Sequence, residues 1–199
     1  GKIGPSLVIT LIRGLKEAGV KANVYAVSRF TRAELGNVAK KLEEYGAIII
    51  RADLSDPDQV KSLPNVENVI FMVGKKFGTE EDPGTTWITN VFIPALIANK
   101  FKDSKFIIFS TGNVYPLVSI SSGGATEDIE PSPVGEYAWS ALARERIFQY
   151  YGIKYGIKGV IIRLNYSCEL RYGVLVDLGL KVFKGEPIDF SMGSVNVKW

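Results

Sequence analysis

The sequence predicts a doubly wound parallel α/β sheet, and two observations indicate this fold class. Segments with helical apolar spacing alternate with short strand-like segments along nearly the whole chain. The strand-like segments, such as KFIIFSTG (105–112), are almost continuously apolar, as strands are when helices cover both faces of their sheet. The composition agrees with a folded domain, because 46% of the 199 residues are hydrophobic and 23% are charged.

The predicted elements follow one another in a regular order. Helices are expected over 5–19, 32–46, 57–63, 85–101 and 136–156, and strands over 22–29, 47–54, 68–74, 105–112 and 159–165. The loop 116–134 is rich in Gly, Ser and Pro. A doubly wound sheet begins with a strand, whereas this series begins with a helix. We therefore expect an apolar strand and a further glycine directly upstream of Gly1.

Composition and charge exclude several classes of function. The net charge of +3 is small, and no run of Lys and Arg alternates with aromatic residues, so we expect no nucleic-acid partner. No apolar stretch approaches the roughly 20 residues of a membrane span, so we expect no membrane association and a cytoplasmic protein. The absence of His excludes His-based triads and His-ligated zinc. Cys168 is the only cysteine; we interpret it as a small core residue and expect no metal site.

Residues in the first part of the chain suit a dinucleotide cofactor. Gly1 and Gly4 come directly before the first helix, where glycines let a backbone approach a pyrophosphate at the helix N-terminus. The alternative is an ordinary loop. The end of the first predicted strand has Ser28, Arg29 and Arg32 in place of the carboxylate that binds a ribose 2′-hydroxyl. Guanidinium groups suit a 2′-phosphate, so we predict NADP as the cofactor, with NAD as the alternative.

The second half of the chain carries hydroxyl and phenol groups after its strands. STGNVY (110–115) spans a strand end and includes Thr111. EYAWSALARE (136–145) opens the last long helix with Tyr137, and RLNY (163–166) closes the next strand. Taken alone, Thr111 could cap a turn and Tyr137 could pack its ring on a helix surface. Their order along the chain favours a functional role.

In this order the segments resemble the extended short-chain dehydrogenase/reductase family, the NAD(P)-dependent epimerases and dehydratases. STGNVY is similar to the family's S-[ST]-x-x-V-Y segment, and residues 127–145 are similar to its segment ending in Y-x-x-S-K-x-x-x-E. The resemblance implies that Thr111 and Tyr137 are catalytic. DLSD (53–56) and VIFMVG (69–74) look like cofactor-binding segments, and residues 173–190 look like the helix and GEP turn that begin the substrate-binding part.

The resemblance also implies binding residues and a domain organisation. The substrate-binding residues are Asn113 and Asn165. A dinucleotide-binding Rossmann domain is expected over 1–165 and a partial substrate-binding region over 166–199. The oligomeric state is left open, with a homodimer as one option. The cofactor-binding residues are Gly1, Gly4, Ser28, Arg29, Arg32, Asp53, Leu54, Val73, Gly74 and Asn90.

The chain departs from the family at one catalytic position, because Ala141 stands where the family has Lys. An ordinary Tyr has a pKa of about 10, and a nearby cation helps it to lose its proton near neutrality. Arg144 follows Ala141 on the same predicted helix face, so its charge can partly substitute. Of the two alternatives for Arg144, a solvated helix residue is the one that we expect. We expect Tyr137 to be a weaker or slower acid–base group than in the family.

Two functions remain open on the sequence. The leading one is an NAD(P)-dependent epimerase, dehydratase or reductase of a sugar-like or other hydroxyl or carbonyl substrate. In it, Thr111 holds the substrate oxygen and Tyr137 exchanges the proton. The alternative is a catalytically impaired dinucleotide-binding sensor or scaffold, with Ala141 as its signature. A nucleotide-sugar substrate is not favoured, because the residues after GEP lack the Arg-Asp pair of nucleotide-sugar members.

Overall fold

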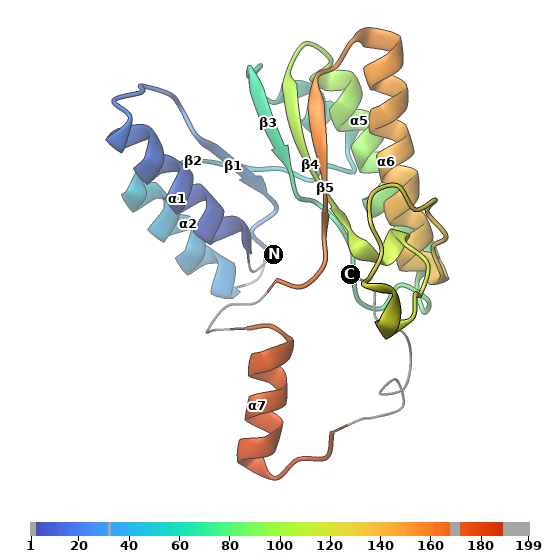
Figure 1. The fold of residues 1–199 in the computed structure, drawn as a ribbon. Coiled ribbons are helices and arrows are strands. Elements are labelled where there is room, and N and C mark those ends of the chain that lie inside the picture. Colours follow the sequence, from blue (N-terminus) through green and yellow to red (C-terminus); the bar gives the residue numbers. More distant parts are fainter. Residues whose placement is uncertain (1–2, 32, 168–171, 189–199) are drawn as a thin grey trace. The chain divides into compact units, whose positions relative to one another are not determined.

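A computed structural model of the chain describes residues 3–31, 33–167 and 172–188 (Figure 1). It divides the chain into two compact units, Gly1–Pro64 and Asn65–Trp199. The predicted domain boundary at residue 165 concerns function and stays a prediction. No helix in the described ranges combines the length and the apolar character that crossing a membrane requires.

The first unit is a small parallel α/β arrangement. Its elements are α1 (Ile3–Glu17), β1 (Tyr25–Ser28), α2 (Ala33–Tyr45), β2 (Ile48–Arg51) and α3 (Pro57–Ser62). β1 pairs in parallel with β2, so that Tyr25 lies opposite Ile48 and Ser28 opposite Arg51. Its core consists of Ile12, Val24, Ala26, Leu42 and Ala47. The register brings the carboxyl ends of the two strands together, where side chains of a parallel sheet meet ligands.

The second unit is built on a three-stranded parallel sheet in the order β3-β4-β5. Its strands are β3 (Asn68–Phe71), β4 (Lys105–Thr111) and β5 (Gly159–Leu164). The helical elements are α4 (Pro83–Trp87), the π-helical turn η1 (Ile88–Phe92), α5 (Ile93–Lys100), the 3₁₀ turns η2 (Gly112–Val114) and η3 (Ile120–Ser122), α6 (Gly135–Tyr155) and α7 (Val174–Lys184).

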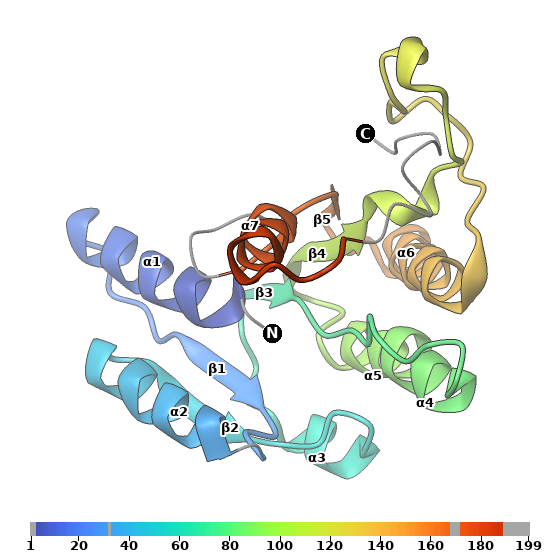
Figure 2. The ribbon, with the colours of Figure 1, turned by 90° about the horizontal axis from the view of Figure 1, so that it is seen from below.

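Helices α5 and α6 cover the same face of this sheet (Figures 1 and 2). Burial alternates along β4, where Phe106, Ile108 and Ser110 are buried. The ring of Phe148 on α6 lies 5.5 Å from that of Phe71 and 5.1 Å from that of Phe106. This aromatic cluster fixes α6 over the sheet, because tilted ring pairs at such distances pack favourably.

The structure confirms the predicted class of fold, an α/β arrangement whose paired strands are all parallel. One predicted element differs in detail, because the helix expected over 85–101 contains the π-helical turn η1. There the Ile93 N–H bonds to the Ile88 carbonyl, five residues back. Pro94, which follows, has no N–H for the carbonyl of Asn90. The strand expected upstream of Gly1 lies outside the sequence and stays a prediction.

Candidate active site

The carboxyl end of β4 presents two adjacent hydroxyl groups that have different tasks. The Ser110 hydroxyl donates to the carboxylate of Glu145 on α6. The Thr111 hydroxyl accepts the Asn113 N–H at 3.2 Å and caps the turn η2. Both residues are buried, and successive side chains of a strand point to opposite faces. The catalytic role of Thr111 stays a prediction.

Glu145 forms a buried ion pair that anchors α6 to β5. Its side chain is 1% exposed, and Arg163 donates to it through Nε at 3.1 Å and through Nη2 at 2.8 Å. The Arg163 guanidinium also lies 4.7 Å from the ring centre of Tyr115. The bonds to Glu145, more than any other interaction, raise the pKa of Arg163 above its ordinary value. Sequence reasoning matched Glu145 to a motif but did not identify its partner.

The first turn of α6, which carries Tyr137, is held by the loop after β3. The helix has no side-chain cap of its own, and Glu80 accepts the Glu136 N–H at 2.7 Å instead. A carboxylate there is favourable because helix N-termini carry partial positive charge. Gly135 has a φ of 82°, which only glycine adopts readily. Tyr137 itself is half-buried.

Ala141, one turn after Tyr137, is completely buried. It forms a small apolar cluster with Leu142 and with Val114 of η2. The cluster brings the turn after Thr111 against the helix of Tyr137, so the two predicted catalytic residues belong to elements that touch. A longer side chain at position 141 would have to fit against Val114 and Leu142.

Asn90 is the centre of a buried polar network. Its side chain is fully buried, and its Nδ2 donates to Ser140 Oγ at 2.8 Å and to the Lys75 carbonyl at 3.0 Å. Its Oδ1 accepts the Lys75 N–H at 2.7 Å. Ser140 in turn donates to the Tyr137 carbonyl at 3.0 Å. The predicted cofactor residue Asn90 therefore joins the end of β3 to the active-site helix.

Arg144 is the buried cation of this network and is only 6% exposed. It donates to the carbonyl of Phe109 at 2.9 Å and to Asn90 Oδ1 at 3.0 Å. Burial lowers the pKa of Arg144 below its ordinary value, while interactions with Tyr137 and Glu145 oppose that fall. The alternative that Arg144 is a solvated helix residue is wrong. Its helix face was predictable, whereas its contact with Asn90, 54 positions away, was not.

The predicted substrate residues Asn113 and Asn165 lie close to the end of β4. A Cβ placed on Gly112 would lie 1.5 Å from Asn165 Oδ1, so the Asn165 side chain occupies space that only a glycine leaves. Asn113 lies in η2, directly after that glycine. Both residues therefore lie in segments next to Thr111.

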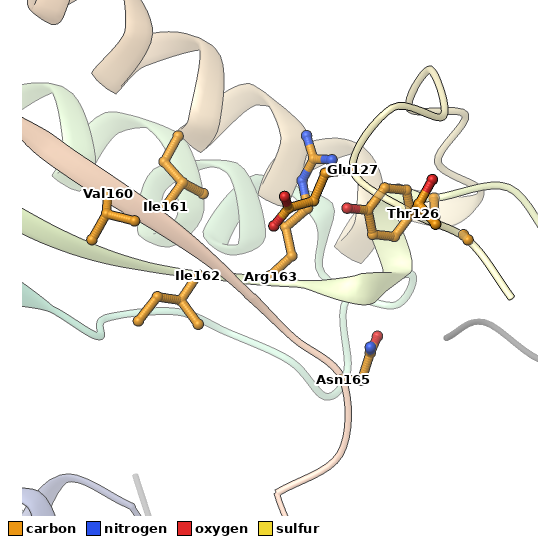
Figure 3. Close-up of a pocket in the computed structure, with 9 residues that line it drawn as sticks. Thr126, Glu127, Val160, Ile161, Ile162, Arg163 and Asn165 are labelled. Atoms are coloured by element: carbon orange, nitrogen blue, oxygen red, sulfur yellow. The ribbon is translucent and has the colours of Figure 1, made fainter.

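A cavity of about 400 Å³ opens next to Asn165 (Figure 3). Thr126 and Glu127 of the loop line it together with Arg163 of β5. Thr111 and Tyr137 do not line this cavity. It is therefore a neighbour of the catalytic candidates and not their pocket.

Four predicted cofactor residues lie at or just after the carboxyl ends of β1 and β2. Ser28 ends β1, and Arg29 Nη1 lies 3.8 Å from Asp53 Oδ2. Asp53 also accepts the N–H and hydroxyl of Ser55, and these bonds lower its pKa more than Arg29 does. Leu54 is buried beside them. The strand ends thus present a guanidinium, a hydroxyl and a carboxylate together.

The remaining predicted cofactor residues that the structure describes, apart from Asn90, lie in α1 and after β3. Gly4 lies in the first turn of α1, and Val73 and Gly74 follow β3. A Cβ on Gly74 would lie 2.8 Å from Arg144 Nη2. Gly1, Arg32 and Cys168 lie outside the described residues. In the part of the chain that the structure describes, no group of three His, Cys, Asp or Glu side chains is suited to a metal ion.

The fold and these contacts define a class of protein. The chain belongs to the NAD dependent epimerase/dehydratase family, whose model matches residues 9–167. A curated relative is the GDP-6-deoxy-D-mannose reductase of Pseudomonas aeruginosa, which is 31% identical over 122 residues. That match covers 57% of this chain and 40% of the relative, so the chain spans less than half of that protein's length.

Solved structures show the same fold. The UDP-glucuronic acid 4-epimerase of Bacillus cereus, in complex with UDP-glucuronic acid and NAD, superposes with a TM-score of 0.73 at 21% identity. The similarity covers 92% of this chain and 60% of that one. For RMD from Pseudomonas aeruginosa complexed with NADPH, the TM-score is 0.59 at 22% identity, with 72% and 53% covered.

Proposed function

We propose that the protein containing this chain is an NADP(H)-dependent epimerase, dehydratase or reductase that acts on a nucleotide sugar or another sugar-like substrate. The observation that carries the proposal is the placement of Thr111 and Tyr137. They lie on β4 and α6, which the cluster of Val114 and Ala141 holds together. The relatives named for GDP-6-deoxy-D-mannose and UDP-glucuronic acid support a nucleotide sugar, which the sequence alone did not favour.

The residues suggest how the reaction is divided. When bound, the nicotinamide ring supplies or accepts the hydride. Tyr137 takes the proton from the substrate hydroxyl during oxidation and returns it to the carbonyl oxygen during reduction. The Thr111 hydroxyl, whose oxygen accepts the Asn113 N–H, donates its hydrogen to the same substrate oxygen. Asn113 and Asn165 would orient the substrate beside it.

The side chains present suit a dinucleotide. The hydroxyl of Ser28 and the guanidinium of Arg29 would bind the adenosine end, with Arg29 on the 2′-phosphate of NADP(H). Leu54 offers an apolar surface beside Asp53. Val73, Gly74 and Asn90 belong to the same proposed set of cofactor-binding residues. Gly1, Gly4 and Arg32 complete the proposed set, which keeps the dinucleotide domain at 1–165 and the substrate region at 166–199.

Cofactor preference is tested by calorimetry with NADPH and NADH. Arg29→Ala should weaken NADPH binding by about 1–3 kcal/mol, the range for losing a charge-assisted partner. NADH binding should change little, since its ribose has a hydroxyl there. Equal losses for both cofactors, or tighter binding of NADH by the unmodified protein, would contradict the assignment.

Catalysis is tested by turnover of a panel of nucleotide sugars with the full-length protein. Tyr137→Phe should lower kcat by about 10²–10⁴-fold, the range for a general acid–base group, and leave the Kd for NADPH unchanged. Thr111→Val should also lower kcat. Tyr150→Phe is the matched control, because Tyr150 lies on the same helix and is 53% exposed. Full activity of Tyr137→Phe would remove Tyr137 from the mechanism.

A second function, a dinucleotide-binding sensor or scaffold, is favoured by one observation. Position 141 has a buried alanine where the family has a lysine. Tight NADPH binding without turnover of any substrate in the panel would support this function over the first.

A further inference from the structure

Arg144 is a buried positive charge without a bonded counter-ion. Its hydrogen-bond partners among the described residues are neutral oxygens: the Phe109 carbonyl at 2.9 Å, Asn90 Oδ1 at 3.0 Å and the Asn90 carbonyl at 3.4 Å. The neighbouring carboxylate, Glu145, is bonded to Arg163 instead. Burying a charge with neutral partners alone is costly. Packing alone favours an apolar residue here, as at Phe148 one turn further along.

The contacts of Arg144 show what the charge holds in place. Pro94 has no N–H to offer the Asn90 carbonyl, and Arg144 Nε donates to that carbonyl at 3.4 Å. Nη2 meets the Asn90 side chain and lies against Gly74 at the end of β3. Nη1 reaches the last residues of β4 through the Phe109 carbonyl. One guanidinium thus ties together the ends of two parallel strands, which is where ligands of such sheets bind.

The position of Arg144 on α6 relates it to Tyr137. The two residues are seven apart, which places them on one helix face with Ala141 between them. Ala141 is fully buried against Val114, so a lysine there would displace this packing. The side chain of Arg144, by contrast, is already hydrogen-bonded to the Phe109 carbonyl and to Asn90 in the structure. Arg144 is therefore the buried cation on the helix face that also carries Tyr137.

We propose that Arg144 is the positioning residue of this site. Through its bonds to Asn90 and to the Phe109 carbonyl it orders Asn90 and the segment that follows β3. This inference rests on the function proposed above. It also makes a claim that needs no turnover, because an ordered Asn90 holds the Lys75 amide whether or not substrate is present.

The test compares Arg144→Met, which keeps an unbranched side chain but not the charge, with Arg144→Lys, which keeps the charge. Arg146→Met is the control, because Arg146 lies on the same helix with a 55% exposed side chain and a 3.7 Å contact to Glu130. In Arg144→Met the Lys75 amide should exchange hydrogen at least about 10-fold faster, since its acceptor loses support. The Kd for NADPH should rise by a similar factor. Arg146→Met should change neither.

Arg144→Lys separates charge and hydrogen bonding from packing. Because lysine keeps the charge and N–H donors, Lys75 exchange and the Kd for NADPH should change less in Arg144→Lys than in Arg144→Met. Unchanged exchange in a folded Arg144→Met, or equal changes in both variants, would overturn the proposal. If Arg144→Met does not fold, complete loss of Lys75 protection in a folded Arg144→Lys would overturn it as well.

Failure of the proposed function gives a different pattern. If the unmodified protein binds no NADPH, the dinucleotide function fails. If it binds NADPH without turnover, the exchange and binding measurements still decide the role of Arg144. Unchanged Lys75 exchange together with unchanged NADPH affinity in Arg144→Met would then overturn the inference.

Discussion

Glu145 and Glu130 show how strongly surroundings decide what one carboxylate contributes. The side chain of Glu145 is 1% exposed and bonds to Arg163, whereas that of Glu130 is 90% exposed and lies 3.7 Å from Arg146. Water screens the second pair and not the first, so surface pairs contribute little and broken buried pairs cost much.

We predict that Glu145→Gln lowers the free energy of unfolding by about 3–5 kcal/mol, the cost of leaving one partner of a buried pair uncompensated. Glutamine keeps the size of the side chain, so the loss reports charge and not volume. Glu130→Gln should change it by less than about 1 kcal/mol. Urea unfolding of both variants measures the difference, and equal losses would show that the buried pair has no special weight.

The lowered pKa of Asp82 leads to a prediction about the stability of the fold at low pH. Its hydrogen bond with Lys75 and those with Thr85 lower the pKa of Asp82 from 3.8 to about 2. A carboxylate with a depressed pKa stabilises the fold above the unfolded value and loses that contribution as the pH falls from about 4 to about 2. Asp82→Asn should therefore show a weaker decline of the unfolding midpoint over this interval. Asparagine also caps helices, so a fall as steep as in the unmodified protein would contradict the shift.

Residues of the site differ in how far sequence could predict them. Thr111, Tyr137 and Asn90 could be proposed from the sequence, because each follows a recognisable pattern at a strand end or on a helix, and their roles stay predictions. The burial of Arg144 and the partner of Glu145 were not, because both depend on residues distant in the sequence. Arg163, for example, lies 18 positions from Glu145 and meets it only when β5 packs beside α6.

At the scale of elements, α6 begins at a glycine with a positive φ and contains a second glycine with helical backbone angles. Gly135 has a φ of 82°, and a Cβ there would lie 2.9 Å from Glu80 Oε1. Gly152 is helical, and its Cβ would meet only the Ile157 carbonyl at 3.5 Å. The same substitution should therefore have opposite effects at the two positions.

We predict that Gly135→Ala lowers the free energy of unfolding by about 1–2 kcal/mol, the cost of a left-handed backbone for an L-residue. Gly152→Ala should raise it by about 0.5–1 kcal/mol, since alanine favours helix over glycine. Thermal unfolding of the two variants tests both signs. Destabilisation by Gly152→Ala, or none by Gly135→Ala, would contradict this account.

Helices and strands were predictable as elements because their apolar periodicity is local. Predicted and observed bounds agree closely for the active-site helix, which was expected over 136–156 and spans Gly135–Tyr155. The π-helical turn was not predictable, because Asn90 within it bonds to Ser140 and Arg144, which are distant in the sequence. Pro94 was visible in the sequence, but whether a helix bends, breaks or widens at proline depends on neighbouring side chains. Here Arg144 donates to the Asn90 carbonyl.

At the scale of the whole molecule, the strands differ in how many partners they have. In the described sheets, β4 alone has hydrogen-bonded neighbours on both sides, whereas β1 and β2 form a two-stranded sheet. Two-stranded sheets are marginal by themselves. We predict that amides of β4 exchange hydrogen most slowly and that those of β1 and β2 exchange faster, as mass spectrometry of peptic fragments can measure. Equal protection of β1 and β4 would contradict this ranking.

The parallel α/β class was predictable from alternation alone, whereas the division at residue 64 was not. The sequence around Pro64 has no long linker or change of composition. A boundary between compact units depends on which contacts cross it, and contact patterns are a property of the folded chain.

The π-helical turn at Ile88–Phe92 restricts how this chain can change its length. Such a turn holds one residue more than the corresponding α-helical stretch, so deleting one residue would return it to regular helix. The helical segments on either side would keep their faces, but the wide turn that carries Asn90 would be lost. Asn90 could no longer face Ser140 and Arg144 together. Descendants of this sequence should therefore tolerate insertions and deletions in the loop 116–134 and purge them from 88–94, even where every amino acid type is retained.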